Sequence, residues 1–220
     1  MGHYLVTGVS RGIGRCVATR LLADGHEVIG LARTAGSVTG LGLSGVWVAD
    51  LARPAELTVP FSLPSLDGVV HAAGIVRPGI LSQPLVEDFT EQFAVNVTAV
   101  AELTRLLLPS LRDARGTVVL VNSGSGLNAR SPLAGYGASK VALRAYADVL
   151  RAEERSIRVS TVYPGRTSTE MQRVVRSAEN AEYDASAYLS PETVAGVICS
   201  VLMLPADGVV TDVTLRPRPS

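Results

Sequence analysis

Tyr136 and Lys140 are the residues whose types and spacing most directly suggest a chemical role. The stretch from 135 to 140 reads GYGASK, and Lys140 is the single lysine among the 20 Lys and Arg residues. Residues four apart on a helix lie on one face, so these two side chains are expected to be neighbours. A free tyrosine has a pKa of about 10 and gives up its proton reluctantly, but a nearby ammonium group lowers that pKa. The pair is therefore suited to proton transfer at a substrate oxygen that gains negative charge, as in the reduction of a ketone.

Lysine and arginine are not equivalent at position 140. The lysine ammonium is a compact charge with rotatable donors, so one donor can serve the tyrosine while others hold a second group. The arginine guanidinium is flat and bulkier and does not fill the same space. We interpret Lys140 as a lysine that arginine cannot replace, although chance alone could also leave one lysine in an arginine-rich chain.

A glycine-rich loop, TGVSRGIG at 7–14, is expected to link a strand to a helix. Gly8 permits the tight turn, Gly12 lets the backbone approach a pyrophosphate, and Gly14 lets the helix pack closely on the strand. The start of the helix then faces the phosphate charge. The alternative is a turn with a purely structural role.

Short apolar runs alternate with helical patterns along the chain. Strands are expected at 3–7, 27–32, 45–50, 66–74, 116–123, 157–165 and 210–215. Helices are expected at 12–25, 87–111 (ending near Pro109), 135–154 and 190–204 (capped by Ser190), whereas three glycines argue against a full helix at 34–44. Continuous apolar strands between helices are typical of a parallel sheet covered on both faces. We therefore predict an α/β fold, a Rossmann-type doubly wound parallel sheet of about seven strands with helices on both faces, as one domain over 1–220.

The composition argues against several classes of protein. A hydrophobic share of 47% supports a sizeable core and rules against a disordered chain. The net charge is zero and no basic run is present, so no nucleic-acid partner is expected. Cys16 and Cys199 match no metal-ligand spacing and are interpreted as core residues, so no metal site is expected. No apolar run approaches about 18 residues and no signal peptide is recognisable, which predicts no membrane partner and a cytoplasmic location.

From residue 3 to about residue 170, the motifs and their order resemble the short-chain dehydrogenase/reductase family. The loop at 7–14 matches that family's T-G-x-x-x-G-x-G, and Tyr136 with Lys140 matches its Y-x-x-x-K. Ser123 precedes Tyr136 by thirteen residues, which is the family interval, and PGRTST at 164–169 matches P-G-x-x-x-T.

One motif departs from the family pattern. HAAG at 71–74 stands where the family usually has N-A-A-G, an asparagine that braces the sheet. We interpret His71 as a hydrogen-bonded substitute for that asparagine.

The resemblance implies roles for four catalytic residues. Tyr136 would act as general acid or base, and Lys140 would support it while holding the cofactor ribose. Ser123 would donate a hydrogen bond to the substrate oxygen, with Ser125 as the nearby alternative. Asn96 would hold a water that passes protons to Lys140, although an asparagine within a helix could also be a satisfied interface group.

The resemblance also implies a set of cofactor contacts at the strand ends. Asp50 and Leu51 would lie at the adenine, with a capping role as the alternative for Asp50, and Pro164 and Gly165 would border the nicotinamide. The full set comprises Gly8, Ser10, Arg11, Gly12, Ile13, Gly14, Arg33, Asp50, Leu51, Ala73, Gly74, Tyr136, Lys140, Pro164, Gly165, Thr167 and Thr169.

The end of the second strand predicts NADPH/NADP+ as the cofactor. Enzymes of this shape that use NAD place an acid there to bind the ribose hydroxyls. Here Ala32 occupies that place, Arg33 follows, and Glu27 lies at the far end of the strand. Arg33 and Arg11 can pair with the extra phosphate through charge-assisted hydrogen bonds. Alternatively, both arginines are ordinary surface charges.

The resemblance weakens towards the end of the chain. The segment 170–189 is expected to cover the substrate, with Tyr183 and Tyr188 as either substrate contacts or surface aromatics. The final TDVTLRPRPS replaces the family's glycine-rich ending, which puts a tetramer in doubt, while the helices at 87–111 and 135–154 suggest a homodimer.

The predicted function is an NADPH-dependent oxidoreductase that interconverts a carbonyl compound and a secondary alcohol, both small molecules. A protein that senses NADP without turnover is the first alternative, and the intact serine, tyrosine and lysine argue against it. An epimerase or dehydratase is a weaker alternative, because such relatives usually carry an added sugar-binding domain.

Overall fold

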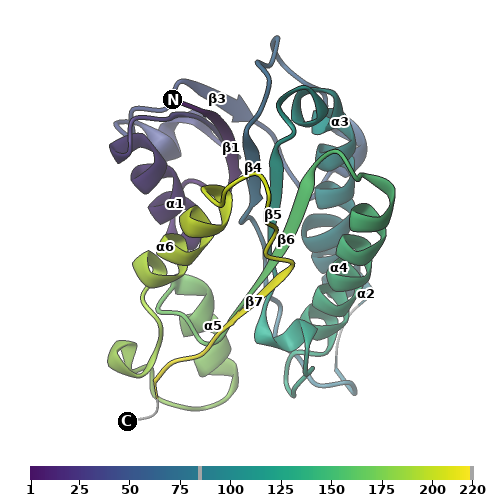
Figure 1. Cartoon of the computed structure of the whole chain (residues 1–220). Coiled ribbons are helices and arrows are strands. Elements are labelled where there is room, and N and C mark those ends of the chain that lie inside the picture. The colour runs from purple at the N-terminus through teal and green to yellow at the C-terminus, as the bar shows by residue number, and fades with distance from the viewer. Residues whose placement is uncertain (84–85, 219–220) are drawn as a thin grey trace.

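The fold is built on one parallel sheet, seen in a computed structural model that describes residues 1–83 and 86–218. Within those residues the sheet has seven strands in the order β3-β2-β1-β4-β5-β6-β7, and each neighbouring pair is parallel (Figure 1). The strands are β1 (His3–Thr7), β2 (Glu27–Ala32), β3 (Gly45–Val48), β4 (Gly68–His71), β5 (Thr117–Val121), β6 (Arg158–Pro164) and β7 (Asp212–Leu215). The predicted doubly wound sheet is confirmed, with most strands slightly shorter than expected.

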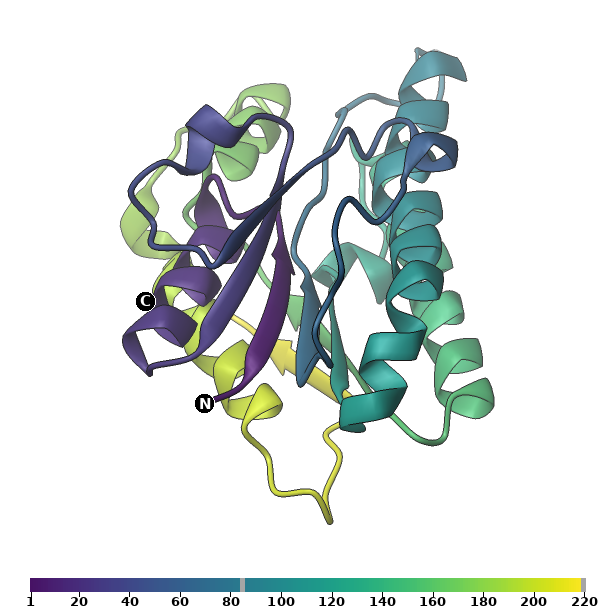
Figure 2. The ribbon, with the colours of Figure 1, turned by 90° about the horizontal axis from the view of Figure 1, so that it is seen from above.

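Helices cover both faces of the sheet. On one face lie α1 (Gly12–Ala23) and α6 (Pro191–Leu202); on the other lie α2 (Val86–Phe93), α3 (Ala99–Ala114) and α4 (Ala134–Glu153) (Figure 2). Each layer encloses its own apolar cluster, which is why the central strands are apolar on both faces. The strand order reverses between β1 and β4, and in such sheets ligands bind at the carboxyl ends of the strands at this point.

The helix expected at 87–111 differs from the prediction in two ways. A π-turn, Ala94–Thr98, separates α2 from α3, and α3 continues through Pro109 to Ala114. The proline does not end the helix because fully buried Leu111 anchors the following turn in the core. The helix ends where Arg115 adopts a left-handed conformation (φ 51°) and the Gly116 amide donates to the Leu111 carbonyl at 2.8 Å.

The continuous helical stretch Val86–Ala114 is long and apolar enough to cross a membrane by length and composition alone. Its inner face carries buried Leu103 and Leu107, which pack in the core between the sheet and α4. Its outer face carries Arg105 and Arg112, each in an ion pair. The stretch is therefore a core helix of this fold.

Other helix ends follow the expected local signals. Gly25, with φ 80°, follows the end of α1 in a conformation that favours glycine, and the His26 amide donates to the Leu21 carbonyl at 3.0 Å. Ser190 caps α6 by accepting from the Thr193 amide at 3.0 Å. The segment 34–44 contains only a short 3-10 turn, Ala35–Val38, as its glycines suggested.

Two segments beyond the family motifs reach the carboxyl edge of the sheet. The segment 170–189, for which no helix was predicted, forms α5 (Glu170–Ala178) and a 3-10 turn, Ala185–Ala187. The segment after β7 runs towards α5 along the same edge (Figure 1). Both bound the cavity described next.

Candidate active site

The glycine loop joins β1 to α1 as predicted and brings backbone close to the site. Gly8 and Gly12 have φ of 70° and 57°, which favour glycine. A Cβ on Gly8 would lie 2.9 Å from the Ala73 Cα, so the HAAG segment packs directly on the loop. A Cβ on Gly14 would lie 2.5 Å from the Gly8 carbonyl oxygen, so α1 can approach the strand only with glycine there.

A cavity of about 370 Å³ lies at the carboxyl edge of the sheet and contains the predicted catalytic group. Ser123, Tyr136 and Lys140 all line it. The end of β5 positions the serine, and the first turns of α4 position the tyrosine and the lysine. Tyr136 is 8% exposed and Lys140 only 4%, so both are nearly shielded from water. The structure thus brings together three residues that the sequence placed in one site.

Lys140 is held by backbone as well as by its neighbours. Its Nζ donates to the Val121 carbonyl at 3.0 Å and lies 5.8 Å from the centre of the Tyr136 ring. Burial lowers the pKa of Lys140 to about 8, which still leaves the ammonium form dominant at neutral pH. The charge that we expected beside the tyrosine is therefore present.

The pKa of Tyr136 differs from our expectation. Burial raises this pKa, and the hydrogen bond with Ser123 acts in the opposite direction. We expected Lys140 to lower it, but loss of hydration is the larger effect in this arrangement. Tyr136 is therefore a phenol that holds its proton at neutral pH, which suits it to donate.

Asn122 is a positioning residue that our sequence analysis missed. It is buried at the end of β5, where its Oδ1 accepts from the Ser123 amide at 2.8 Å and its Nδ2 donates to the Lys140 carbonyl at 3.0 Å. It thereby ties the serine to the helix that carries the tyrosine and lysine. A polar residue directly after an apolar strand was the available signal.

The two candidate serines differ in their neighbours. Both line the cavity, and the Ser123 Oγ accepts from the Ser125 amide at 3.1 Å. Of the two serines, Ser123 is the one that acts on the Tyr136 hydroxyl, where it opposes the rise in the tyrosine pKa. This contact favours Ser123 as the donor to a substrate oxygen.

Replacing Ser123 by alanine is expected to lower kcat by about 10²-fold, the effect of removing one donor to a developing oxyanion. Ser125→Ala is expected to change kcat little, because the Ser125 backbone amide, not its hydroxyl, contacts Ser123. Steady-state kinetics on the two variants would check this, and the reverse order of effects would identify Ser125 as the donor.

The segment after β6 lies beside the glycine loop. Pro164, Gly165, Thr167 and Thr169 all line the cavity, and their contacts with a cofactor stay a prediction. Thr169 begins α5 by accepting from the Gln172 amide. A Cβ on Gly12 would meet only Thr169, at 3.5 Å, so the backbone of the loop is accessible from the cavity side. Of the loop residues 8–14, Ile13 lines the cavity.

The expected adenosine end is marked by Ala32, buried at the end of β2, and exposed Arg33 after it. Neither Arg33 nor Arg11 forms an ion pair with any residue that the structure describes. Asp50 accepts from the Ala52 amide at 3.0 Å within a turn and caps no helix, because the next 3-10 turn begins at Pro54 after Arg53, and Leu51 is buried in the core. The arginine charges remain available to an anion.

Comparison with known proteins identifies the family. A family model described as short chain dehydrogenase matches residues 3–180. The chain belongs to the short-chain dehydrogenase family. Dehydrogenase/reductase SDR family member 11 of Homo sapiens is 31% identical, covering 97% of this chain and 93% of its own. Benzil reductase ((S)-benzoin forming) of Bacillus subtilis is 28% identical, covering 92% and 93%.

Among solved structures, a short-chain dehydrogenase of Escherichia coli CFT073 complexed with NADPH matches with a TM-score of 0.86 at 26% identity. The match covers 98% of this chain and 97% of that one. The seven-stranded parallel sheet is therefore the short-chain dehydrogenase fold, and the chain is an oxidoreductase by family.

Asn96, the asparagine matched to the short-chain dehydrogenase pattern, lies fully buried in the π-turn. Its Oδ1 accepts from the Ile75 amide at 2.9 Å, and its Nδ2 donates to the Ile75 carbonyl and to the Ser139 Oγ, both at 3.0 Å. Ser139 in turn donates to the Tyr136 carbonyl at 2.8 Å. The side chain therefore braces the site through protein contacts, and the water relay through Asn96 stays a prediction.

His71 replaces the asparagine that short-chain dehydrogenases usually carry, and the structure shows how. Its Nε2 lies 3.0 Å from the Thr104 Oγ1, which itself donates to the Val100 carbonyl at 2.7 Å. Nε2 must therefore carry the proton, so His71 braces α3 against the sheet as interpreted. Its Nδ1 is buried without a partner among the described residues, and burial lowers the pKa of His71 to about 4.

Acid should destabilise the protein through His71. The unfolded chain binds a proton at the ordinary pKa of 6.5, whereas the folded chain does so only near 4, so stability is lost as the pH falls between these values. His71→Asn is expected to remove roughly 2–3 kcal/mol of this loss. Urea unfolding of both proteins at pH 7 and pH 4.5 would measure the fall in unfolding free energy. An equal fall in the unchanged protein and in His71→Asn would contradict the role given to His71.

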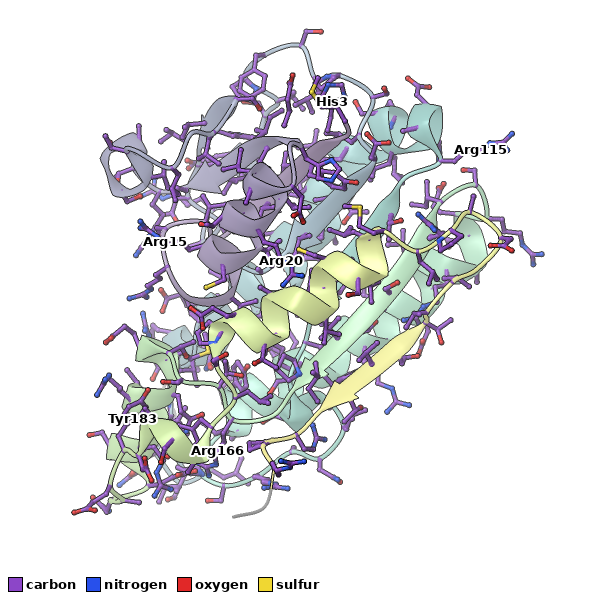
Figure 3. All side chains as sticks on the ribbon, turned by 60° about the vertical axis from the view of Figure 1, so that its left-hand side comes forward. His3, Arg15, Arg20, Arg115, Arg166 and Tyr183 are labelled. Carbon is purple, nitrogen blue, oxygen red and sulfur yellow. The ribbon has the colours of Figure 1, made fainter. Side chains whose placement is uncertain are left out.

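The two tyrosines of the segment 170–189 do not line the cavity. The Tyr183 hydroxyl lies 2.6 Å from the Ser168 Oγ, and the Arg173 guanidinium packs 4.0 Å above the Tyr183 ring. The rings of Tyr183 and Tyr188 pack against each other in a tilted arrangement, with 5.4 Å between their centres. Figure 3 shows Tyr183 at the periphery of this segment. The segment covers the cavity as expected, but its contacts there are Met171, Gln172, Val175 and Glu179.

Among the described residues, no group of three or more His, Cys, Asp or Glu side chains is placed to hold a metal ion. Cys16 and Cys199 are free thiols on α1 and α6, and both pack with the apolar cluster between these helices and the sheet.

Proposed function

We propose that the protein is an NADPH-dependent oxidoreductase that interconverts a small carbonyl compound and a secondary alcohol. The observation that carries this proposal is the convergence of Ser123, Tyr136 and Lys140 on one cavity beside the glycine loop. Membership of the family and the NADPH-bound Escherichia coli relative support it.

The residues divide the chemistry between them. Ser123 donates a hydrogen bond to the carbonyl oxygen, and Tyr136 delivers a proton to that oxygen as negative charge develops. Lys140 contributes a charge that stabilises the phenolate left on Tyr136. In the reverse direction, the same phenolate takes the proton from the alcohol.

NADPH would supply the hydride when bound. The glycine loop and the start of α1 would hold its pyrophosphate, and Lys140 its nicotinamide ribose. Pro164 and Gly165 would border the nicotinamide. The cradle fits such a group because side chains at Gly8 or Gly14 would collide with backbone.

Cofactor choice tests the proposal. NADPH is expected to exceed NADH by about 10²-fold in kcat/KM, because Arg33 and Arg11 can pair with the additional phosphate. Ala32→Asp combined with Arg33→Ala should reduce or reverse this ratio while kcat with saturating cofactor stays the same. Initial rates with both cofactors would check this, and equal use of NADH by the unchanged protein would contradict it.

A protein that senses NADP without turnover is the main rival. A screen of diketones, aldehydes and small alcohols with NADPH separates the two, and benzil is a reasonable first substrate given the Bacillus subtilis relative. An epimerase or dehydratase on this fold is the third candidate.

We further propose a homodimer in the cytoplasm. The outer face of α4 exposes Val141 and Val149, at 47% and 53%, which supports pairing through the helices α2, α3 and α4. Neither nucleic acid nor a membrane is a proposed partner.

A further inference from the structure

The segment after β7 forms part of the active-site wall. Arg216 and Pro217 line the cavity, although this part of the chain lies outside the matched family motifs. The Arg216 Nη1 donates to the Leu215 carbonyl at 2.9 Å and to the Tyr163 carbonyl at 3.3 Å. Pro217 packs on Gly165, where a Cβ would lie 2.9 Å from the proline ring. The guanidinium is thus held in place by backbone.

Arg216 lies beside Gly124 in the wall of the cavity. A Cβ on Gly124 would be 3.6 Å from both Nη1 and Nη2 of Arg216. Gly124 directly follows Ser123, whose hydroxyl is proposed to bind that oxygen. A positive charge therefore packs against the residue that follows Ser123 in the chain.

The cavity offers Arg216 no acidic partner. Glu179 is the only carboxylate that lines it within the described chain, and it is bound to Arg166 and Arg176, each at 2.7 Å. Arg216 appears in no ion pair among the residues that the structure describes. Figure 3 shows Arg166 near the end of β7. The cavity wall keeps a positive charge that the protein does not neutralise.

An independent feature of the same cavity also points to a hydrogen-bond acceptor. Gln172 on α5 lines the cavity and is 9% exposed, and its Nε2 is buried without a partner among the described residues. Buried donors are normally satisfied, so an unpaired amide in a cavity wall indicates a group supplied by a ligand.

We propose that Arg216 binds a carboxylate of the substrate, with Gln172 as a further donor, so that the substrate is a short oxo acid or the matching hydroxy acid. This inference rests on the proposed carbonyl reduction. Arginine pairs with a carboxylate through two parallel hydrogen bonds, and Arg216 has donors left beyond the one that serves backbone. The cavity volume of about 370 Å³ also receives the nicotinamide, which restricts the substrate to a small molecule.

Binding and turnover would be measured separately. Unbranched 2-oxo and 3-oxo acids of three to six carbons, each paired with its methyl ester, are titrated by calorimetry into the NADP+-loaded protein. At least one acid is expected to bind 10- to 100-fold more tightly than its ester, on the scale of charge-assisted hydrogen bonds. Arg216→Gln should abolish that difference while leaving ester affinity and NADP+ affinity unchanged. Arg218→Gln, in the same segment but away from the cavity, is the matched control.

The outcomes distinguish the two proposals. Equal binding of acids and esters, or a loss of NADP+ affinity in Arg216→Gln, would overturn the carboxylate site, the latter by assigning Arg216 to the cofactor. Selective binding of an acid that NADPH does not reduce would support the site and count against carbonyl reduction. Arg216→Lys, which keeps the charge but not the paired geometry, should retain part of the preference for the acid.

Discussion

Replacing Tyr136 by phenylalanine is expected to lower kcat for carbonyl reduction on the order of 10⁴-fold, the upper range for loss of a positioned acid. The variant loses the hydroxyl that is proposed to deliver the proton to the substrate oxygen beside Ser123. The ring remains, so the packing of α4 against the cavity is preserved. NADPH affinity should stay within a few-fold, because the hydroxyl acts on the substrate.

Single-turnover kinetics and a fluorescence titration of NADPH would measure the two quantities separately. Tyr183→Phe is the matched control. The Tyr183 hydroxyl shares a hydrogen bond with the Ser168 hydroxyl, but Tyr183 does not line the cavity. Substantial residual turnover in Tyr136→Phe would remove the tyrosine from its assigned role.

Replacing Lys140 by arginine is expected to reduce both turnover and cofactor affinity, although the charge is retained. Lys140 is 4% exposed and its ammonium donates to the Val121 carbonyl, and a planar guanidinium cannot reproduce this compact placement. We expect kcat/KM to fall on the order of 10³-fold, because misplaced geometry alone costs about 10²-fold and cofactor binding weakens as well.

The control for this substitution is Arg144→Lys, one turn further along α4 on the exposed side. It should leave kinetics and the melting temperature unchanged. Circular dichroism and thermal melting of Lys140→Arg would establish that it folds. A folded Lys140→Arg with near-normal kcat/KM would show that charge, not lysine geometry, is what the site requires.

The parts of the fold and site that follow local rules were predictable from the sequence. Apolar strand runs specified the parallel sheet, and the spacing of Tyr136 and Lys140 placed them on one helix face. Gly8 and Gly12 marked a loop whose backbone conformations require glycine. In each case the sequence signal and the physical constraint involve residues close together in the chain.

The features that the sequence did not predict depend on contacts between residues far apart in the chain. Pro109 does not end its helix because Leu111 is buried against the sheet. The pKa of Tyr136 is raised because the effect of burial exceeds the opposing effect of Ser123, and burial cannot be read from a motif. Asn122 and Arg216 make their contacts at the site between segments that meet only in the folded chain.

The residues around the cavity come from two kinds of segment, and this has a consequence for evolution. Ser123 directly follows β5, and Tyr136 and Lys140 sit on α4. Both β5 and α4 contribute residues to the apolar core. Gln172 and Arg216 belong to α5 and the segment after β7, which contribute little to that core. Substitutions in these two segments can therefore change which substrate is accepted without a large loss of stability. Laboratory selection for new substrates should accumulate its changes there, while the proton-transfer residues stay fixed.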